Sequence, residues 1–205
     1  MQQRSWIYGL VAVVVVLLVW SGIQPYDRAT WWMEVAPIFL AAPVLWLSRE
    51  RFPLTSLLVV LIAAHAIVLL VGGAYTYARV PAGFWVQEQF SLSRNPYDKL
   101  GHFMQGFVPA LVAREIFVRQ GIVRAGVWPS ILGVAMALSV SLIYELIEWG
   151  AAIALGQGAE EFLGTQGDVW DTQSDMGMAF LGALIAVTLL GRWHDRQIAA
   201  LSPNR

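Results

Sequence analysis

The chain has no cysteine among its 205 residues. This absence excludes disulfides, thiolate metal sites, iron–sulfur clusters and cysteine nucleophiles, so a bound metal ion would need oxygen and imidazole ligands. Charged residues are also scarce, because Asp, Glu, Lys and Arg make up 13% of the chain, whereas soluble domains carry roughly 25%. With a net charge of -1, the chain lacks the basic field that gathers nucleic acid, and we expect no nucleic-acid partner.

Apolar residues are plentiful instead: they make up 58% of the chain, and the mean hydropathy is +0.60. Such a chain needs lipid as its solvent, and we predict an all-α, polytopic membrane bundle with about six transmembrane helices. A signal peptide is the alternative for the first apolar run, but no small-residue cleavage site follows that run. The predicted spans are residues 6–23, 32–47, 54–71, 100–118, 127–154 and 176–190.

The connections between these spans are short, and none is polar enough to fold separately. We therefore predict a single transmembrane domain over residues 1–205, with an aromatic interfacial segment at 72–97 and an acidic outer loop at 155–175. Cytoplasmic ends of membrane proteins carry an excess of Lys and Arg. An inside N-terminus places nine of the 13 Lys and Arg residues on the inner side. Both termini are thus predicted to be cytoplasmic.

Ionisable residues gather in three short stretches, at the start of the fourth span, inside the fifth and just before the sixth. Asp98 and His102 are four residues apart, and Glu145 and Glu148 are three apart, so each pair shares one face of a helix. Under the predicted topology, all three stretches reach the outer interface. The predicted metal ligands are Asp98, His102, Glu145, Glu148, Asp168, Asp171 and Asp175.

Carboxylates that converge near a membrane need compensation for their charge. Two of them ~5 Å apart repel by about 3 kcal/mol at an effective dielectric of ~20, and a charge inside the bilayer costs roughly 2.5–3.5 kcal/mol. The nearby cations Arg79, Arg94 and Lys99 are too few to pair all six carboxylates. Unless several carboxyls stay protonated, this composition predicts a divalent cation (Mg, Mn, Ca or Zn), and the ligands suffice for one ion or two.

Purely structural roles are alternatives for some of these residues. Thr172 and Asp175 have the spacing of a capping box, so Asp175 is equally consistent with a helix cap. Asp98 and Lys99 are consistent with a cap followed by a snorkelling lysine. The two glutamates of the fifth span are harder to explain in this way, because they lie mid-helix in an apolar run.

The motifs around these residues resemble the YjdF family of bacterial inner-membrane proteins. The matching strings are Tyr97–Gly106, Tyr144–Trp149, Gly156–Gly158 and Gly164–Met176. The resemblance covers nearly the whole chain and implies a multi-pass protein of the bacterial cytoplasmic membrane, without implying an activity. The order of acidic and histidine residues is also similar, more weakly, to VanZ-type proteins, which implies an envelope-related role. The Glu-x-x-Glu pair and the extra aspartates depart from that second pattern.

Three functions are consistent with this sequence. The first is a metal-dependent enzyme that acts on a lipid-linked or phosphorylated envelope substrate, with Glu145 or Glu148 as base and His102 as metal ligand or proton carrier. In this hypothesis Arg79, Arg94 and Lys99 bind the substrate. The second is a small transporter or ion pathway, and the third is a non-catalytic accessory protein with a structural metal ion. The oligomeric state is left open.

Overall fold

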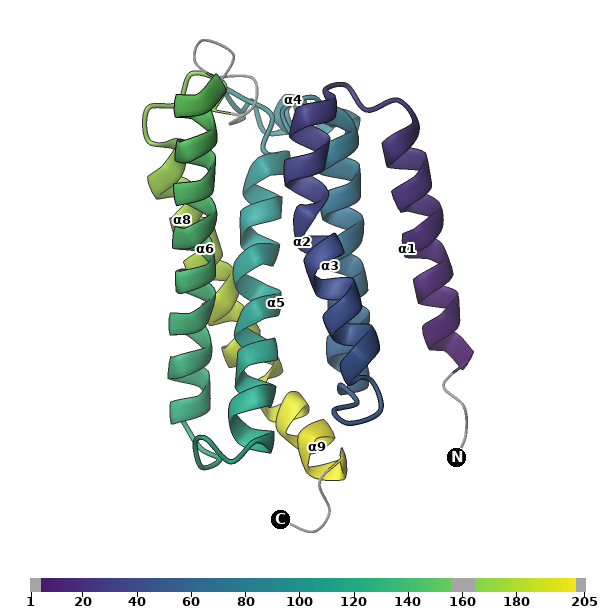
Figure 1. Ribbon diagram of the computed structural model, residues 1–205. Helices are drawn as coiled ribbons and strands as arrows, with labels where there is room; N and C mark the ends of the chain where they lie inside the picture. Colours follow the sequence, from purple (N-terminus) through teal and green to yellow (C-terminus); the bar gives the residue numbers. More distant parts are fainter. Residues whose placement is uncertain (1–4, 156–164, 202–205) are drawn as a thin grey trace. The chain divides into compact units, whose positions relative to one another are not determined.

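The computed structural model describes residues 5–155 and 165–201, and this part of the chain is helical, without strands (Figure 1). The predicted all-α fold is therefore confirmed. Five helices are long and apolar enough to cross a membrane. They are Ser5–Ile23, Arg28–Ser48, Ser56–Tyr75, Trp128–Ala154 and Asp171–Leu201. The fourth predicted span is also a helix, α5 (Tyr97–Arg119), but it is less apolar and does not belong to this set.

The chain divides into two compact units. The first consists of Met1–Leu54 and Val59–Asp98, and the second of Thr55–Leu58 and Lys99–Arg205. The boundary between Asp98 and Lys99 falls within the first turn of α5, so Asp98 belongs to the same helix as the α5 residues of the second unit. The single domain predicted for residues 1–205 stays a prediction.

The first unit contains α1 (Ser5–Ile23), α2 (Arg28–Ser48), most of α3 (Ser56–Tyr75) and α4 (Pro81–Gln89). Its core is formed by Trp31, Val35 and Leu70, against which apolar residues of α1 and α2 pack. The indole Nε1 of Trp31 donates a hydrogen bond to Ser21 Oγ at 3.1 Å, which ties α2 to the end of α1. Asp27 caps α2 by accepting from the backbone N–H of Thr30 at 2.7 Å.

The predicted interfacial segment 72–97 differs from the structure at its start, because Gly72–Tyr75 still belongs to α3. The chain then turns through Thr76 and Tyr77, both with positive φ, and the Tyr77 ring covers Gly72 so closely that no Cβ fits there. The helix α4 follows and exposes Trp85. The residues Gly72–Tyr75 are small or aromatic, and such residues occur both in membrane spans and in interfacial segments. The sequence therefore predicted the end of this span too early.

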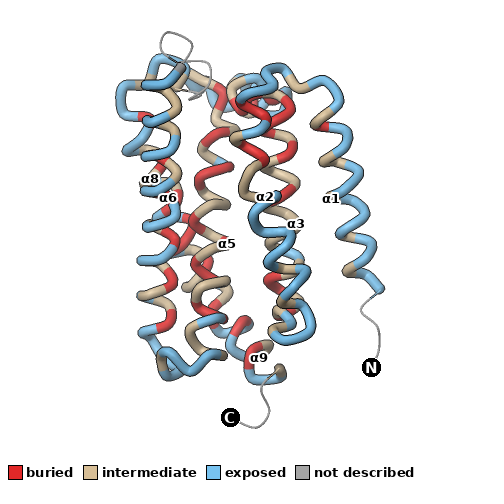
Figure 2. The backbone as a smooth tube through the Cα atoms, viewed as in Figure 1, coloured by how far each residue is buried: buried red, intermediate tan, exposed pale blue. Residues whose placement is uncertain are grey.

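The second unit contains α5, α6 (Trp128–Leu155), α8 (Asp171–Ile185), the π-helical segment η2 (Ala186–Leu190) and α9 (Gly191–Leu201). Small residues let its helices approach closely. A Cβ on Gly106 would overlap the backbone of Ala179, and a Cβ on Gly182 would overlap the backbone of Phe103. Residues buried between these helices appear red in Figure 2. The small residues Ala179, Gly182 and Ala183 of α8 therefore form a buried face for close helix packing.

The last helical run is longer than predicted. It begins at Asp171 and continues through η2 and α9 to Leu201, whereas the sequence predicted a span over 176–190. The polar first turn and the amphipathic α9, which buries His194 and Ile198, carry no continuous apolar signal. A prediction based on apolar runs therefore misses the first and last turns of such a helix.

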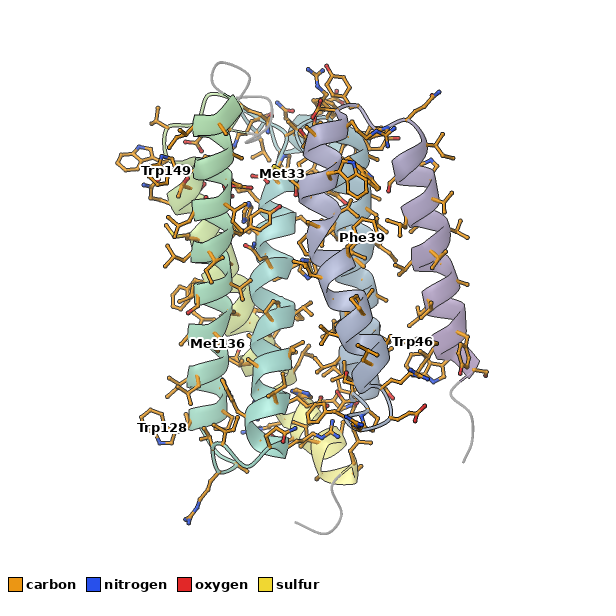
Figure 3. All side chains as sticks on the ribbon, viewed as in Figure 1. Met33, Phe39, Trp46, Trp128, Met136 and Trp149 are labelled. Atoms are coloured by element: carbon orange, nitrogen blue, oxygen red, sulfur yellow. The ribbon has the colours of Figure 1, made fainter. Side chains whose placement is uncertain are left out.

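Two tryptophans of α6 lie at its first residue and near its last turns. Trp128 and Trp149 are both exposed and point away from the neighbouring helices of their unit (Figure 3). They are 21 residues apart, which corresponds to about 30 Å at ~1.5 Å per residue and matches the hydrocarbon thickness of a bilayer. Because tryptophan favours the membrane interfaces, Glu145 and Glu148 lie within about a turn of one interface.

Candidate metal centre

Three ligand-bearing side chains meet where α5 and α8 begin. Asp98 and His102 lie on successive turns of α5, and Asp175 comes from the second turn of α8. Each offers a ligand atom, and these atoms all lie within 4.8 Å of one another. All three residues are buried. Figure 1 shows that α5 and α8 begin, and α6 ends, at the same end of this unit, as the predicted topology requires.

The imidazole of His102 is oriented by a neighbour on its own helix. Its Nδ1 lies 3.1 Å from Oε1 of Gln105, one turn further along α5, and donates a hydrogen bond to that oxygen. The other nitrogen, Nε2, faces Oδ2 of Asp175 at 3.8 Å. This distance is too long for a hydrogen bond, but ligand atoms about 2.1 Å from a common ion lie roughly 3–4 Å apart. The pair is therefore spaced as two ligands of one cation.

The glutamates of α6 lie beside this group. Glu145 is buried, and its Oε1 is 3.7 Å from Nδ1 of His102. Glu148 is half-buried, one turn beyond Glu145 on the same face of α6. Ser141, fully buried, lies on that face one turn before Glu145. Glu145 and Glu148 thus share one face of α6, as predicted, and Glu145 lies next to the imidazole of His102.

Lys99 has a role that the sequence did not indicate. Its ammonium lies 2.8 Å from Oδ1 of Asp171, 2.6 Å from Oδ1 of Asp175 and 2.6 Å from Oγ of Ser174. Lys99 therefore binds across the first turns of α8 rather than snorkelling away from the site. The capping-box reading of Asp175 is wrong, because α8 begins at Asp171 and has no side-chain cap.

We call the group formed by Asp98, Lys99, His102, Glu145, Asp171 and Asp175 the acidic cluster. Its four carboxyl groups are buried, and the Lys99 ammonium pairs with two of them, those of Asp171 and Asp175. Even with a protonated imidazole, the ionised cluster would carry an excess of negative charge. Such an excess at the edge of a membrane favours either bound protons or a cation.

The remaining predicted site residues lie outside this group. Asp168 is half-buried, and its Oδ1 accepts from the backbone N–H of Trp170 at 2.9 Å, which shapes the turn before α8. Arg79 and Arg94 belong to the first unit, where the guanidinium of Arg79 lies 4.1 Å from the centre of the Tyr26 ring. Of the predicted acidic outer loop 155–175, residues 156–164 lie outside the described residues.

A second buried polar cluster was missed by the sequence analysis. At the opposite end of the second unit, Glu115 of α5 is fully buried and binds three side chains. Its carboxylate lies 2.9 Å from His194 Nε2, 2.7 Å from Arg119 Nη1 and 2.8 Å from Thr55 Oγ1. We call this group the Glu115 cluster. The spacing of Glu115 and Arg119, four residues apart, was its detectable signal, but the partners from Thr55 and α9 were not foreseeable.

The sequence can be compared with those of known proteins. A family model described as "Predicted membrane protein (DUF2238)" matches residues 6–196. The chain belongs to this family. It is 58% identical over 182 residues to the Inner membrane protein YjdF of Escherichia coli (strain K12), covering 89% of this chain and 87% of that protein. No solved structure matches the chain.

These comparisons confirm the resemblance that the motifs indicated. Together with the apolar helices, they make the chain a multi-pass protein of the inner membrane. The weaker likeness to VanZ-type proteins and the predicted orientation of the termini stay predictions.

Proposed function

We propose that the acidic cluster binds a divalent cation and that the chain is a metal-dependent enzyme acting on a phosphorylated or lipid-linked substrate at the outer face of the membrane. The observation that carries this proposal is the meeting of Asp98, His102 and Asp175, all buried, with their ligand atoms within 4.8 Å of one another. Carboxylates with one imidazole favour hard or borderline ions, which are Mg, Mn, Ca and Zn.

The residues around the ligands have properties that suit hydrolysis. A divalent ion supplies Lewis-acid polarisation of a phosphoryl or carbonyl oxygen. Glu145 lies beside the ligand group, with its Oε1 3.7 Å from Nδ1 of His102, and in this proposal it accepts a proton from an attacking water. Glu148, one turn further on, is the alternative base. Lys99, Arg79 and Arg94 remain the predicted substrate-binding cations.

Two exposed tryptophans support a substrate that reaches the site from the lipid. Trp149 follows Glu148 on α6, and Trp170 immediately precedes Asp171 of α8; both are largely exposed. Indole rings favour the headgroup region of a bilayer. The carboxyl groups next to them in the sequence therefore lie close to the depth at which a lipid headgroup would present a phosphate.

The transporter alternative is less well supported. Between the acidic cluster and the Glu115 cluster, the helices of the second unit meet in an apolar layer of Ala110, Ala137 and Ala183. These alanines are fully buried and come from all three of α5, α6 and α8. A coupling ion crossing this unit would need polar groups at this level.

Metal analysis of the detergent-purified protein loaded with Mn²⁺ or Zn²⁺ tests the proposal. We expect bound metal in the wild type and a loss of at least tenfold in affinity in Asp175→Asn. Asp195→Asn is the matched control, since its carboxylate pairs with Arg114 at the opposite end of the same unit. A wild-type protein that retains no divalent ion would overturn the proposal.

Turnover of a panel of lipid phosphates separates an enzyme from an accessory protein. In an enzyme, Glu145→Gln keeps the metal but lowers turnover by about 10²–10⁴-fold, the usual contribution of a general base. If the protein binds metal but hydrolyses nothing in the panel, the accessory role with a structural ion is the better account.

A further inference from the structure

We propose that the ammonium of Lys99 occupies the place of a second cation, so that the acidic cluster holds a single divalent ion. This inference rests on the proposed metal site and adds what determines its stoichiometry. The sequence left one ion and two ions open, because the number of carboxylates suffices for either.

The surroundings of the Lys99 ammonium are those of a bound cation. Three oxygen atoms, from Asp171, Ser174 and Asp175, lie 2.6–2.8 Å from Nζ. Both carboxylates are buried, and the lysine side chain itself is only 17% exposed. A group of two carboxylates and a hydroxyl around one positive centre is also a ligand set that a hard divalent ion accepts.

Asp175 connects the two positions. Its Oδ1 binds the Lys99 ammonium at 2.6 Å, whereas its Oδ2 faces Nε2 of His102 at 3.8 Å. A carboxylate that directs one oxygen to each of two positive centres is the usual bridge of two-metal sites, whose ions lie about 3.5–4 Å apart. Here an amino group stands at one of these two positions.

The charge of the cluster agrees with this assignment. A second divalent ion next to the ammonium would add repulsion between like charges only a few ångströms apart. Removal of the ammonium takes away this ion pair with Asp171 and Asp175 and makes room among the same oxygens. The structure thus assigns to Lys99 the exclusion of a second ion, in addition to any contact with substrate.

Metal stoichiometry in Lys99 variants tests this inference, with Mn²⁺ as the probe and calorimetry plus metal analysis as readouts. We expect one ion per chain in the wild type and two in Lys99→Met, which has a similar length but no charge. Lys99→Gln is a second neutral variant in case the first is poorly folded. Lys99→Arg keeps the positive charge, and we expect it to bind one ion like the wild type.

A double variant locates the additional ion. Asp171→Asn in the Lys99→Met background removes a carboxylate of the vacated position, and we expect the stoichiometry to return to one. A merely structural lysine would not produce this gain and loss of an ion, because misfolding lowers metal binding and does not raise it.

The outcomes distinguish this inference from the proposed function. Two ions in the wild type or in Lys99→Arg, or a single ion in both neutral variants, would overturn the inference and leave the metal site standing. No ion in the wild type but one in the neutral variants would overturn the proposed function and the inference alike, because both require one ion in the wild type. Protein without metal in every variant would overturn both.

Discussion

Nε2 of His194 lies 2.9 Å from Oε2 of Glu115, and both side chains are fully excluded from solvent. This contact joins α9 to α5. The same carboxylate accepts from the backbone N–H of Thr55 at 3.2 Å, and Gln197 of α9 accepts from the N–H of Leu57 at 3.0 Å. Side chains from α5 and α9 therefore add to the local cap at the start of α3, where Thr55 Oγ1 accepts from the N–H of Leu58 at 3.4 Å.

Loss of the Glu115 carboxylate is predicted to destabilise the second unit. In Glu115→Ala, the half-buried Arg119 loses its ion pair with this carboxylate and the buried His194 loses its hydrogen-bond partner there, and breaking a buried ion pair costs about 3–5 kcal/mol. Thermal unfolding in detergent measures the effect. Glu50→Ala is the control, since its ion pair with Arg49 is exposed and contributes little. Similar midpoints for the two variants would contradict this prediction.

Gln105 is predicted to raise the metal affinity through His102. Its Oε1 accepts a hydrogen bond from Nδ1 of the imidazole. With the proton on Nδ1, the lone pair of Nε2 points toward Asp175 and can bind a metal ion. Gln105→Leu removes this acceptor, and loss of such a partner typically weakens metal binding about 10–100-fold. Titration with Zn²⁺ measures the change. Gln105→Glu retains an acceptor and is expected to bind at least as tightly as the wild type; equal weakening by both variants would argue against orientation as the cause.

The close crossing of α5 and α8 is predicted to tolerate no larger side chain at Gly106. A Cβ at this position would overlap the carbonyl of Ala179, which belongs to rigid backbone. Gly106→Val is expected to lower the stability by more than the 1–3 kcal/mol typical of overpacking, because the helices must separate. Gly150→Val is the control, since a Cβ on Gly150 meets nothing within 4 Å. Thermal unfolding of the two variants in the same detergent is the measurement, and equal unfolding midpoints would contradict this prediction.

Asp27 is predicted to make the stability of the first unit depend on pH. Hydrogen bonds from the backbone and hydroxyl of Thr30 lower the pKa of Asp27 below its ordinary value. A lowered pKa in the folded state means that the carboxylate stabilises the fold above the ordinary pKa of about 4 and that this contribution is lost as the pH falls. Asp27→Ala is expected to cost about 0.5–2 kcal/mol at neutral pH.

Asp27→Asn separates the cap from its charge. Asparagine caps helices about as well as aspartate, so this variant is expected to remain stable at pH 7 and to lose part of the decrease in stability toward pH 3. Thermal unfolding across that pH range is the measurement. A wild type and an Asp27→Asn variant with the same pH dependence would rule out the carboxylate as its source.

The sequence predicted the parts of this fold that depend on apolar length and helical spacing. The spans and the shared face of Glu145 and Glu148 follow from local periodicity, and the meeting of Asp98, His102 and Asp175 follows from alternating topology. Lys99 illustrates what local pattern does not contain. Its partners lie 72–76 residues away, and their bonding depends on the rotation of α8 about its axis. That rotation is set by the contacts of Gly106 and Gly182, and no single-helix pattern specifies it.

The alanine layer of the second unit has an electrical consequence. A membrane potential acts on a charge in proportion to the part of the field that the charge crosses, up to about 2.3 kcal/mol per elementary charge for 100 mV. The acidic cluster lies at one end of its helices, and the close-packed layer of Ala110, Ala137 and Ala183 separates it from the other end. Most of the voltage drop therefore falls beyond the cluster, and a cation that arrives from the adjacent aqueous side is expected to bind almost equally well in energised and in depolarised membranes.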